Sequence, residues 1–212
     1  MRLIRVYLPG PLACGALLWL PETAAGHVAR VLRMGVGDAL QVFDGHGNEF
    51  AAVIVALERA RVQVQLGDAV ANASESPLQV TLVQGVARGE KMDFILQKAT
   101  ELGVSAIVPA LAARSTVRLD VQGIARRHAH WQAVLASACE QCGRAQLPAL
   151  AQAAPLGTLI GSGDGDDVLK LLLAPEAGSP ALPALLGAMP AAPRSVHLLV
   201  GPEGGLAPGE ID

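Results

Sequence analysis

The spacing of apolar residues along the chain changes character near residue 75. In residues 1–70, short apolar runs separated by turn-forming residues predict β-strands, and residues 44–48 have the composition of a hairpin. The exception is residues 22–34, where apolar side chains recur at helical spacing. The expected strands are Leu3–Leu8, Ala39–Phe43, Phe50–Leu57 and Val62–Leu66. This part of the chain is predicted to be a small β-barrel with one helix on it.

Residues 71–77 are small and polar, which favours a linker. After them, strand-like runs alternate with helical patterns over residues 92–102, ended by Gly103, and over residues 122–143. The expected strands are Leu78–Val86, Val104–Pro109, Val168–Leu173 and Val196–Val200. Alternation of this kind is typical of βαβ units and a mainly parallel sheet. A second domain of the α/β class is therefore expected over residues 78–212.

Composition narrows the classes of function. Of 212 residues, 51% are hydrophobic and 17% are charged, as in a folded globular protein. Aromatic residues make up 3%, so an extended base-stacking surface is not expected. No apolar run reaches the length of a membrane span, and the N-terminal residues do not have the pattern of a signal peptide. We expect a cytoplasmic protein with no membrane partner.

The formal net charge of −3 is unevenly distributed. Residues 76–150 contain eight basic and five acidic side chains, whereas residues 151–212 contain two basic and seven acidic ones. Clustering matters more than the total for binding a polyanion, so the middle of the chain is the segment most compatible with nucleic acid.

The apolar run Val196–Val200 ends abruptly in the sequence Gly-Pro-Glu-Gly-Gly at residues 201–205. Such loops lie at the carboxyl ends of strands, where ligands bind in α/β sheets, and glycine lets the backbone approach a ligand closely. A simple connection between a strand and a helix has the same composition and stays an alternative. Arg88–Lys91 and Arg114 follow two other expected strands at the same edge. Each cation taken alone is more typical of solvated surface charge than of a site, and it is their shared position after strands, on one rim, that makes them candidates.

Other reaction types find no support in the sequence. Cys139 and Cys142 have CxxC spacing, but they fall inside an expected helix with no second pair, so a redox or zinc site is not expected. The five histidines show no metal-binding spacing, and no metal is expected. No Gly-x-Ser-x-Gly motif, P-loop or dinucleotide fingerprint is present, which disfavours a small-molecule α/β enzyme.

Four motifs in order carry a resemblance to a known family: His27–Arg33 with Gly37-Asp38, Gln84–Val104, Ala138–Arg144 and Leu199–Gly205. On these motifs the chain resembles the bacterial ribosomal RNA small-subunit methyltransferase E family over essentially its whole length. That family methylates N3 of one uridine in small-subunit (16S) rRNA with S-adenosylmethionine as cofactor.

The resemblance implies an α+β, PUA-like β-barrel for RNA binding over residues 1–70, followed by an α/β SPOUT-type domain over residues 78–212. In that fold the C-terminal segment threads a trefoil knot in which the cofactor binds. The family works as a homodimer, and the implied partner is small-subunit rRNA or the assembled small subunit.

The resemblance and the positions of charged residues after the expected strands together give the expected site residues. Arg114 is the candidate for stabilising charge on the uracil, and Glu203 for orienting or accepting its proton. The expected cofactor-binding residues are Leu172, Leu173, Gly201, Pro202, Glu203, Gly204 and Gly205. The expected RNA-binding residues are Arg5, Arg30, Arg33, Arg88, Lys91, Lys98 and Arg144.

In the family, a further segment follows the glycine loop and completes the knot and the cofactor pocket. The present sequence reaches Asp212 before that segment, so the expected SPOUT domain is incomplete and its C-terminal knot segment is absent from this sequence. A non-catalytic RNA-binding or assembly protein of the same fold is therefore the alternative function. A SPOUT methyltransferase with another RNA target is a further one.

Overall fold

The computed structural model describes residues 3–59, 61–115, 121–159, 168–174, 181–189 and 191–211. The chain divides into two compact units. Unit 1 is Met1–Glu75 with Leu135–Leu147, and unit 2 is Ser76–Val134 with Pro148–Asp212. The boundaries expected at residues 71–77 stay a prediction, and the sequence pattern gave no sign that residues 135–147 would join the first unit.

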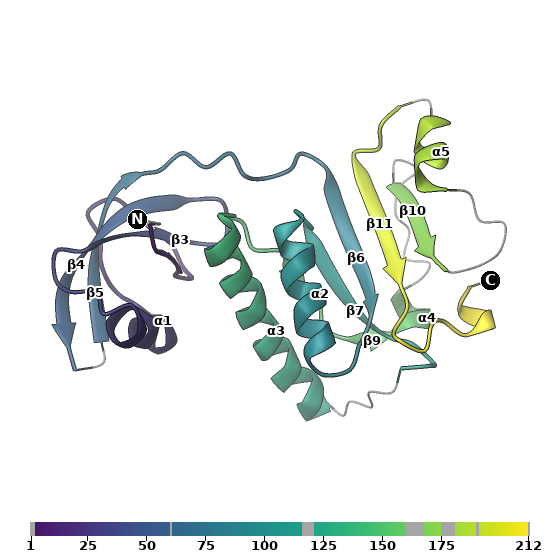
Figure 1. Ribbon diagram of the computed structural model, residues 1–212, viewed down its shortest axis with the longest axis horizontal. Coiled ribbons are helices and arrows are strands. Elements are labelled where there is room, and N and C mark those ends of the chain that lie inside the picture. Colours follow the sequence, from purple (N-terminus) through teal and green to yellow (C-terminus); the bar gives the residue numbers. More distant parts are fainter. Residues whose placement is uncertain are drawn as a thin grey trace. The chain divides into compact units, whose positions relative to one another are not determined.

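Unit 1 is built on one five-stranded sheet, coloured purple to blue in Figure 1. Its elements are β1 (Arg5–Tyr7), β2 (Leu17–Trp19), α1 (Glu22–Gly26), a π-helical turn (His27–Val31), β3 (Ala39–Phe43), β4 (Glu49–Glu58) and β5 (Arg61–Ala69). The strand order is β1-β3-β4-β5-β2, and only β1 and β3 pair in parallel. The helix expected over residues 22–34 is shorter, because regular helical structure ends at Val31 and Arg33 adopts a left-handed φ of 54°.

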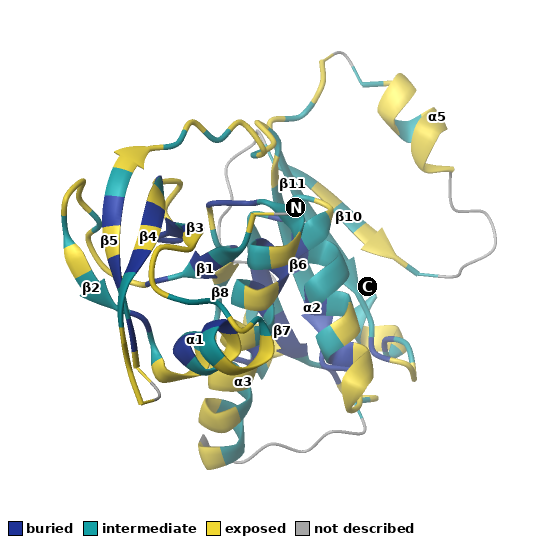
Figure 2. Cartoon of the chain, turned by 60° about the vertical axis from the view of Figure 1, so that its left-hand side comes forward, coloured by how far each residue is buried: buried dark blue, intermediate teal, exposed yellow. Residues whose placement is uncertain are grey.

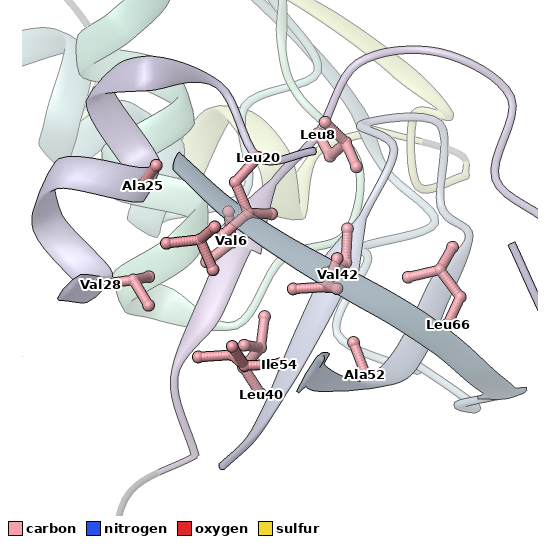
Figure 3. Close-up of a cluster of buried hydrophobic side chains, with 12 residues drawn as sticks. Val6, Leu8, Leu20, Ala25, Val28, Leu40, Val42, Ala52, Ile54 and Leu66 are labelled. Atoms are coloured by element: carbon pink, nitrogen blue, oxygen red, sulfur yellow. The ribbon is translucent and has the colours of Figure 1, made fainter. Parts of the chain in front are cut away.

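The core of unit 1 follows from the two periodicities of its sequence. Alternate residues of β5, Val62, Val64 and Leu66, are buried, as period-2 alternation on a sheet requires. Ala25 and Val28 lie one helical turn apart and bury their side chains against the strands. Figure 3 shows these helical residues facing the side chains that β1, β3 and β4 contribute to the same cluster.

The segment 135–147 is tied to the strands of unit 1 by buried polar contacts. Arg5 Nη1 donates to the Cys139 carbonyl at 2.6 Å, and Arg5 Nη2 donates to the Arg144 carbonyl at 3.1 Å. Its Nε meets Glu49 Oε1 at 2.7 Å, where the two side chains are only 10% and 3% exposed. The Cys139 carbonyl in the last turn of α3 also accepts the Gly143 N–H at 3.1 Å, so Arg5 adds a second, charged donor where the helix ends.

Unit 2 is built on a parallel sheet in the order β10-β11-β6-β7-β8, with β9 also paired to β7. Its strands are β6 (Gln79–Gly85), β7 (Ala106–Leu111), β8 (Ala149–Leu150), β9 (Ala154–Pro155), β10 (Val168–Leu173) and β11 (Ser195–Val200). Its helices are α2 (Glu90–Glu101), the first part of α3 (Val121–Cys142), α4 (Leu156–Leu159), α5 (Leu182–Gly187) and a 3₁₀ turn η2 (Pro208–Glu210). This is the expected alternation of strands and helices around a parallel sheet.

Helix α2 shows how the pattern fixes an element of unit 2. Met92, Leu96 and Thr100 recur every four residues and are buried, whereas Lys91 and Phe94 are exposed and most of the helix is of intermediate exposure (Figure 2). Gly103 ends the helix in a left-handed conformation with φ of 94°. His130 Nε2 of α3 lies 2.8 Å from Asp93 Oδ2, so α2 and the first part of α3 lie side by side.

Candidate functional site

The strand register brings four loops of unit 2 to one edge of the sheet. Leu173 of β10 pairs with Val200 of β11, Val200 pairs with Gln84 of β6, and Gln84 pairs with Pro109 of β7. Figure 1 shows β6, β10 and β11 running in the same direction. The segments after these strands therefore begin at the same level, at the carboxyl edge where α/β proteins bind ligands.

The segment after β11 is a tight turn whose glycines are required by its close contacts. The Gly205 N–H donates to the Pro202 carbonyl at 2.8 Å, and Gly205 has φ of 69°. Pro202 lies against the end of β6, so closely that a Cβ built on Gly85 would be 2.4 Å from Pro202 N. Only glycine fits at residue 85 without moving the turn.

A cavity of about 530 Å³ lies at this edge. That volume falls within the roughly 300–1,000 Å³ typical of small-molecule sites. Arg114 borders the cavity from the loop after β7, and Leu173 borders it from the end of β10. The full lining is Arg114, Leu173, Ala174, Val200, Gly201, Pro202, Glu203, Gly204, Gly205, Leu206 and Ile211.

The expected cofactor residues therefore converge, with one difference. Leu173 and all five residues of the 201–205 turn line the cavity, whereas Leu172 does not. Successive side chains of a strand point to opposite faces of the sheet, so neighbours such as Leu172 and Leu173 do not share one site. Their contact with a cofactor stays a prediction.

Glu203 joins the glycine turn to the loop that precedes α2. Its Oε1 accepts the Arg88 N–H at 3.1 Å and lies 3.5 Å from Lys91 Nζ. Hydrogen bonds from its own backbone N–H and from that of Arg88, with the charge of Lys91 nearby, hold the pKa of Glu203 below its ordinary value. The carboxylate is therefore a charged anchor between two loops at neutral pH.

The expected RNA-binding cations fall into two groups. Arg30, Arg33, Arg88 and Lys91 are exposed to solvent, and Lys98 is half-exposed and paired with Glu101 at 2.8 Å. Arg5 and Arg144 instead direct their guanidinium groups into unit 1. Arg144 Nη2 lies 2.8 Å from Glu75 Oε2, and its side chain is 6% exposed. These two positions do not favour direct contact with RNA, because each guanidinium is largely buried and already paired with a carboxylate, Glu49 for Arg5 and Glu75 for Arg144.

Sequence reasoning missed part of the site. Leu206 and Ile211 complete the apolar side of the cavity, together with a small core formed by Ala110, Ala112 and Leu156. Glu210 was also missed, although its carboxylate contacts two loops of this edge. The spacing of Glu210 three residues after Ala207, at the start of a helical turn, was the available signal.

Cys139 is a buried thiol, and the part of the chain that the structure describes contains neither a metal-binding cluster nor a membrane-spanning helix. Burial raises the pKa of the Cys139 thiol to about 12, with the nearby thiol of Cys142 adding to the effect, so Cys139 is not a reactive thiolate. Within the described ranges no three His, Cys, Asp or Glu side chains are grouped to hold a metal ion. None of the helices described is long and apolar enough to span a bilayer.

Comparison with known proteins gives the site its context. The model of an RNA methyltransferase domain matches residues 74–212, and that of an RNA methyltransferase PUA domain matches residues 20–67. The ribosomal RNA small-subunit methyltransferase E from Neisseria gonorrhoeae is 33% identical and superposes with a TM-score of 0.90, covering 99% of this chain and 84% of that chain. The chain belongs to the ribosomal RNA small-subunit methyltransferase E family.

Other similar proteins extend this picture. A Legionella pneumophila protein described as a methyltransferase is 38% identical, with a TM-score of 0.91 over 100% of this chain and 84% of that chain. Both that structure and the N. gonorrhoeae structure contain S-adenosylmethionine. A Synechocystis member is 33% identical over 92% of this chain. The matches to the Buchnera (strain APS) and Synechocystis members span 58% and 62% of those proteins.

These comparisons confirm the predicted fold class. Unit 1 is the PUA-like domain, and unit 2 is a parallel-sheet α/β domain of the SPOUT methyltransferase type. The threading of a knot stays a prediction.

Proposed function

We propose that this chain uses S-adenosylmethionine to methylate N3 of a specific uridine in small-subunit (16S) rRNA. The observation that carries the proposal is the cavity at the carboxyl edge of unit 2, lined by the glycine turn and by Arg114, in a member of this family. The proposal includes small-subunit rRNA or the assembled small subunit as partner, a homodimer as the working form, and the cytoplasm as location.

The residues around the cavity fit S-adenosylmethionine. Gly201, Gly204 and Gly205 leave the backbone of the turn uncovered, so its polar groups can reach a ligand that carries amino, carboxylate and ribose groups. A Cβ on Gly201 would lie 3.2 Å from both Gly205 C and Leu206 Cγ, so a side chain there would require the turn or Leu206 to shift. Leu173 and Leu206 supply apolar surface for an adenine ring.

When bound, S-adenosylmethionine supplies an electrophilic methyl group. Uracil N3 is weakly acidic, so it becomes a nucleophile as negative charge develops on the ring. Arg114 borders the cavity, and a guanidinium is a cation that can pair with a planar anion. In this position its guanidinium stabilises the developing charge without having to move a proton.

In the same proposal, Glu203 orients or accepts the N3 proton of the uracil. Its contacts with Arg88 and Lys91 favour the orienting role. A carboxylate whose pKa is held below its ordinary value is a weak proton acceptor.

Exposed cations are proposed to bind the RNA backbone. Arg30 and Arg33 of unit 1 and Arg88, Lys91 and Lys98 of unit 2 are the candidates with surface exposure. Neutralising phosphates with such side chains makes binding weaken as salt increases.

A methyl-transfer assay tests the proposal. Small subunits that lack the modification are incubated with the purified chain and methyl-tritiated S-adenosylmethionine, and the RNA is digested and analysed by mass spectrometry. We expect one N3-methyluridine per subunit, and a loss of about 10²-fold in rate for Arg114→Ala because a charge-stabilising donor is removed. Arg126→Ala, an exposed arginine of α3 outside the cavity lining, is the matched control and should keep the wild-type rate. RNA binding without methyl transfer by the wild-type chain would favour the non-catalytic alternative.

A further inference from the structure

Three loops at the carboxyl edge of unit 2 are joined in pairs by single side chains. Glu203 accepts the Arg88 N–H, which links the glycine turn to the loop after β6. The Ser115 hydroxyl donates to the Val86 carbonyl at 3.1 Å, which links the loop after β7 to the loop after β6. Glu210 accepts the Ala113 N–H at 2.8 Å, which links the segment after the glycine turn to the loop after β7.

The Glu210 carboxylate serves two loops at once. Its Oε1 accepts the Ala113 N–H, and its Oε2 accepts the Ala207 N–H, both at 2.8 Å. The bond to Ala207 is the ordinary contact of a glutamate that caps a helical turn. Capping alone does not require the bond to Ala113, which lies 97 residues away in the sequence. Hydrogen bonds to an ionised carboxylate are also among the stronger ones in proteins.

The bond from Glu210 ends at the N–H of Ala113, the residue before Arg114. Arg114 is exposed, and in the described parts of the chain no ion pair holds its guanidinium. Its backbone is instead closely confined, since a Cβ on Gly204 would lie 3.0 Å from the Arg114 carbonyl oxygen and 3.2 Å from its Cβ. The position from which the Arg114 side chain projects is therefore restrained by its backbone, and Glu210 adds to this restraint by binding the N–H of the preceding residue, Ala113.

We propose that Glu210 is a positioning residue for methyl transfer: its carboxylate fixes the Ala113 peptide and thereby directs Arg114 at the cavity. This inference rests on the proposed function, in which Arg114 stabilises charge on the uracil. Misplacing a catalytic group by a small distance lowers the rate strongly even when binding is preserved.

A double-mutant cycle separates positioning from general support of the fold. We expect Glu210→Ala to lower kcat about tenfold, while KM for RNA and Kd for S-adenosylmethionine stay within about twofold of wild type. Glu210→Gln keeps one acceptor oxygen and should lose less activity. In the Arg114→Ala background, Glu210→Ala should cost less than about twofold, because the group it positions is already gone. Glu58→Ala, which removes an exposed carboxylate at the end of β4, is the matched control.

Equal losses from Glu210→Ala in the wild-type and Arg114→Ala backgrounds would overturn the inference. So would a loss that appears only as weaker cofactor binding.

Hydrogen exchange provides a readout that needs no activity. The Ala113 amide should exchange faster in Glu210→Ala than in wild type or Glu58→Ala, since its acceptor is removed. Unchanged exchange at Ala113 overturns the inference whether or not the enzyme is active. An inactive wild-type chain with the expected change in exchange would count against the proposed function and leave the link between Glu210 and the Arg114 loop established.

Discussion

Glu140 is a carboxyl group of unit 1 whose pKa is changed by burial. It lies in the last turns of α3, and its Oε1 accepts the Tyr7 N–H at 2.9 Å. Burial raises the pKa of Glu140 above its ordinary value, although the Tyr7 N–H and the charges of His27 and Arg5 act in the opposite direction. The folded state therefore binds a proton on Glu140 more tightly than the unfolded state does.

The sign of the pH effect follows from this difference. Between the ordinary and the raised pKa of Glu140 the folded chain holds more protons, so this residue's contribution to stability falls as pH rises through that window. Glu140→Gln keeps an acceptor for Tyr7 and removes the buried charge. We expect the variant to be more stable than wild type at pH 7 and to lose this advantage towards pH 4.5, as measured by urea unfolding. Glu58→Gln should show no such trend, and a Glu140→Gln variant destabilised equally at both pH values would contradict the assignment.

At the scale of elements, the end of α3 is held to the β1–β5 sheet by a chain of buried polar contacts. Arg5 bridges Glu49 and two carbonyls of residues 139–144, and Asn72 Nδ2 bonds both Glu49 Oε2 at 2.7 Å and the Gly143 carbonyl at 3.0 Å. Removing one partner of a buried ion pair leaves the other charge uncompensated. These contacts therefore hold the end of α3 and the residues after it against the sheet of unit 1.

Arg5→Met should accordingly destabilise unit 1 by about 3–5 kcal/mol, since Glu49 stays buried without its partner. Loss of the exposed Lys98–Glu101 pair, by Lys98→Ala, should cost about 0–1 kcal/mol. Thiol labelling reports the change locally, because Cys139 is buried beside the Arg5 contact and Cys14 is exposed. We expect Cys139 to be labelled faster in Arg5→Met at unchanged labelling of Cys14. Equal labelling rates for Cys139 in wild type and Arg5→Met would contradict this role for Arg5.

The elements that sequence reasoning predicted best are those whose pattern is local. The strands at Ala39–Phe43 and Val168–Leu173 were predicted with the bounds observed, because apolar runs between turn residues determine them. The strand β2 and the short β8 and β9 were missed, because two or three residues carry too little pattern to distinguish them from loop. They form through pairing with strands far along the chain.

The residues of the candidate site were likewise predictable only where their signal is local in the sequence. Glycine and proline mark the 201–205 turn in the sequence itself, so its convergence with Arg114 at one sheet edge could be expected from βαβ topology. The role of Glu210 could not, since its partner Ala113 lies far away in the sequence. The burial of Arg5 and Arg144 was also missed, because an isolated arginine looks the same in the sequence whether it meets a carboxylate or solvent.

At the scale of the whole molecule, the proposed RNA binding must rely on local patches, because the net charge is −3. Each unit presents exposed cations of its own, Arg30 and Arg33 in unit 1 and Arg88 and Lys91 in unit 2. The cavity and its catalytic candidates all belong to unit 2. Binding of S-adenosylmethionine in this cavity is thus the property on which the proposed methyl transfer depends.

Calorimetric titration with S-adenosylmethionine tests that property most directly. We expect one binding site per chain, and an affinity lower by roughly tenfold or more in Gly85→Ala, because the added methyl group displaces Pro202 and the turn that closes the cavity. Gly157→Ala is the matched control, since a Cβ there meets nothing within 4 Å, and circular dichroism checks that both variants are folded. Binding by wild type and Gly157→Ala with loss in folded Gly85→Ala supports the account. No binding by wild type, or equal affinity in all three, contradicts it.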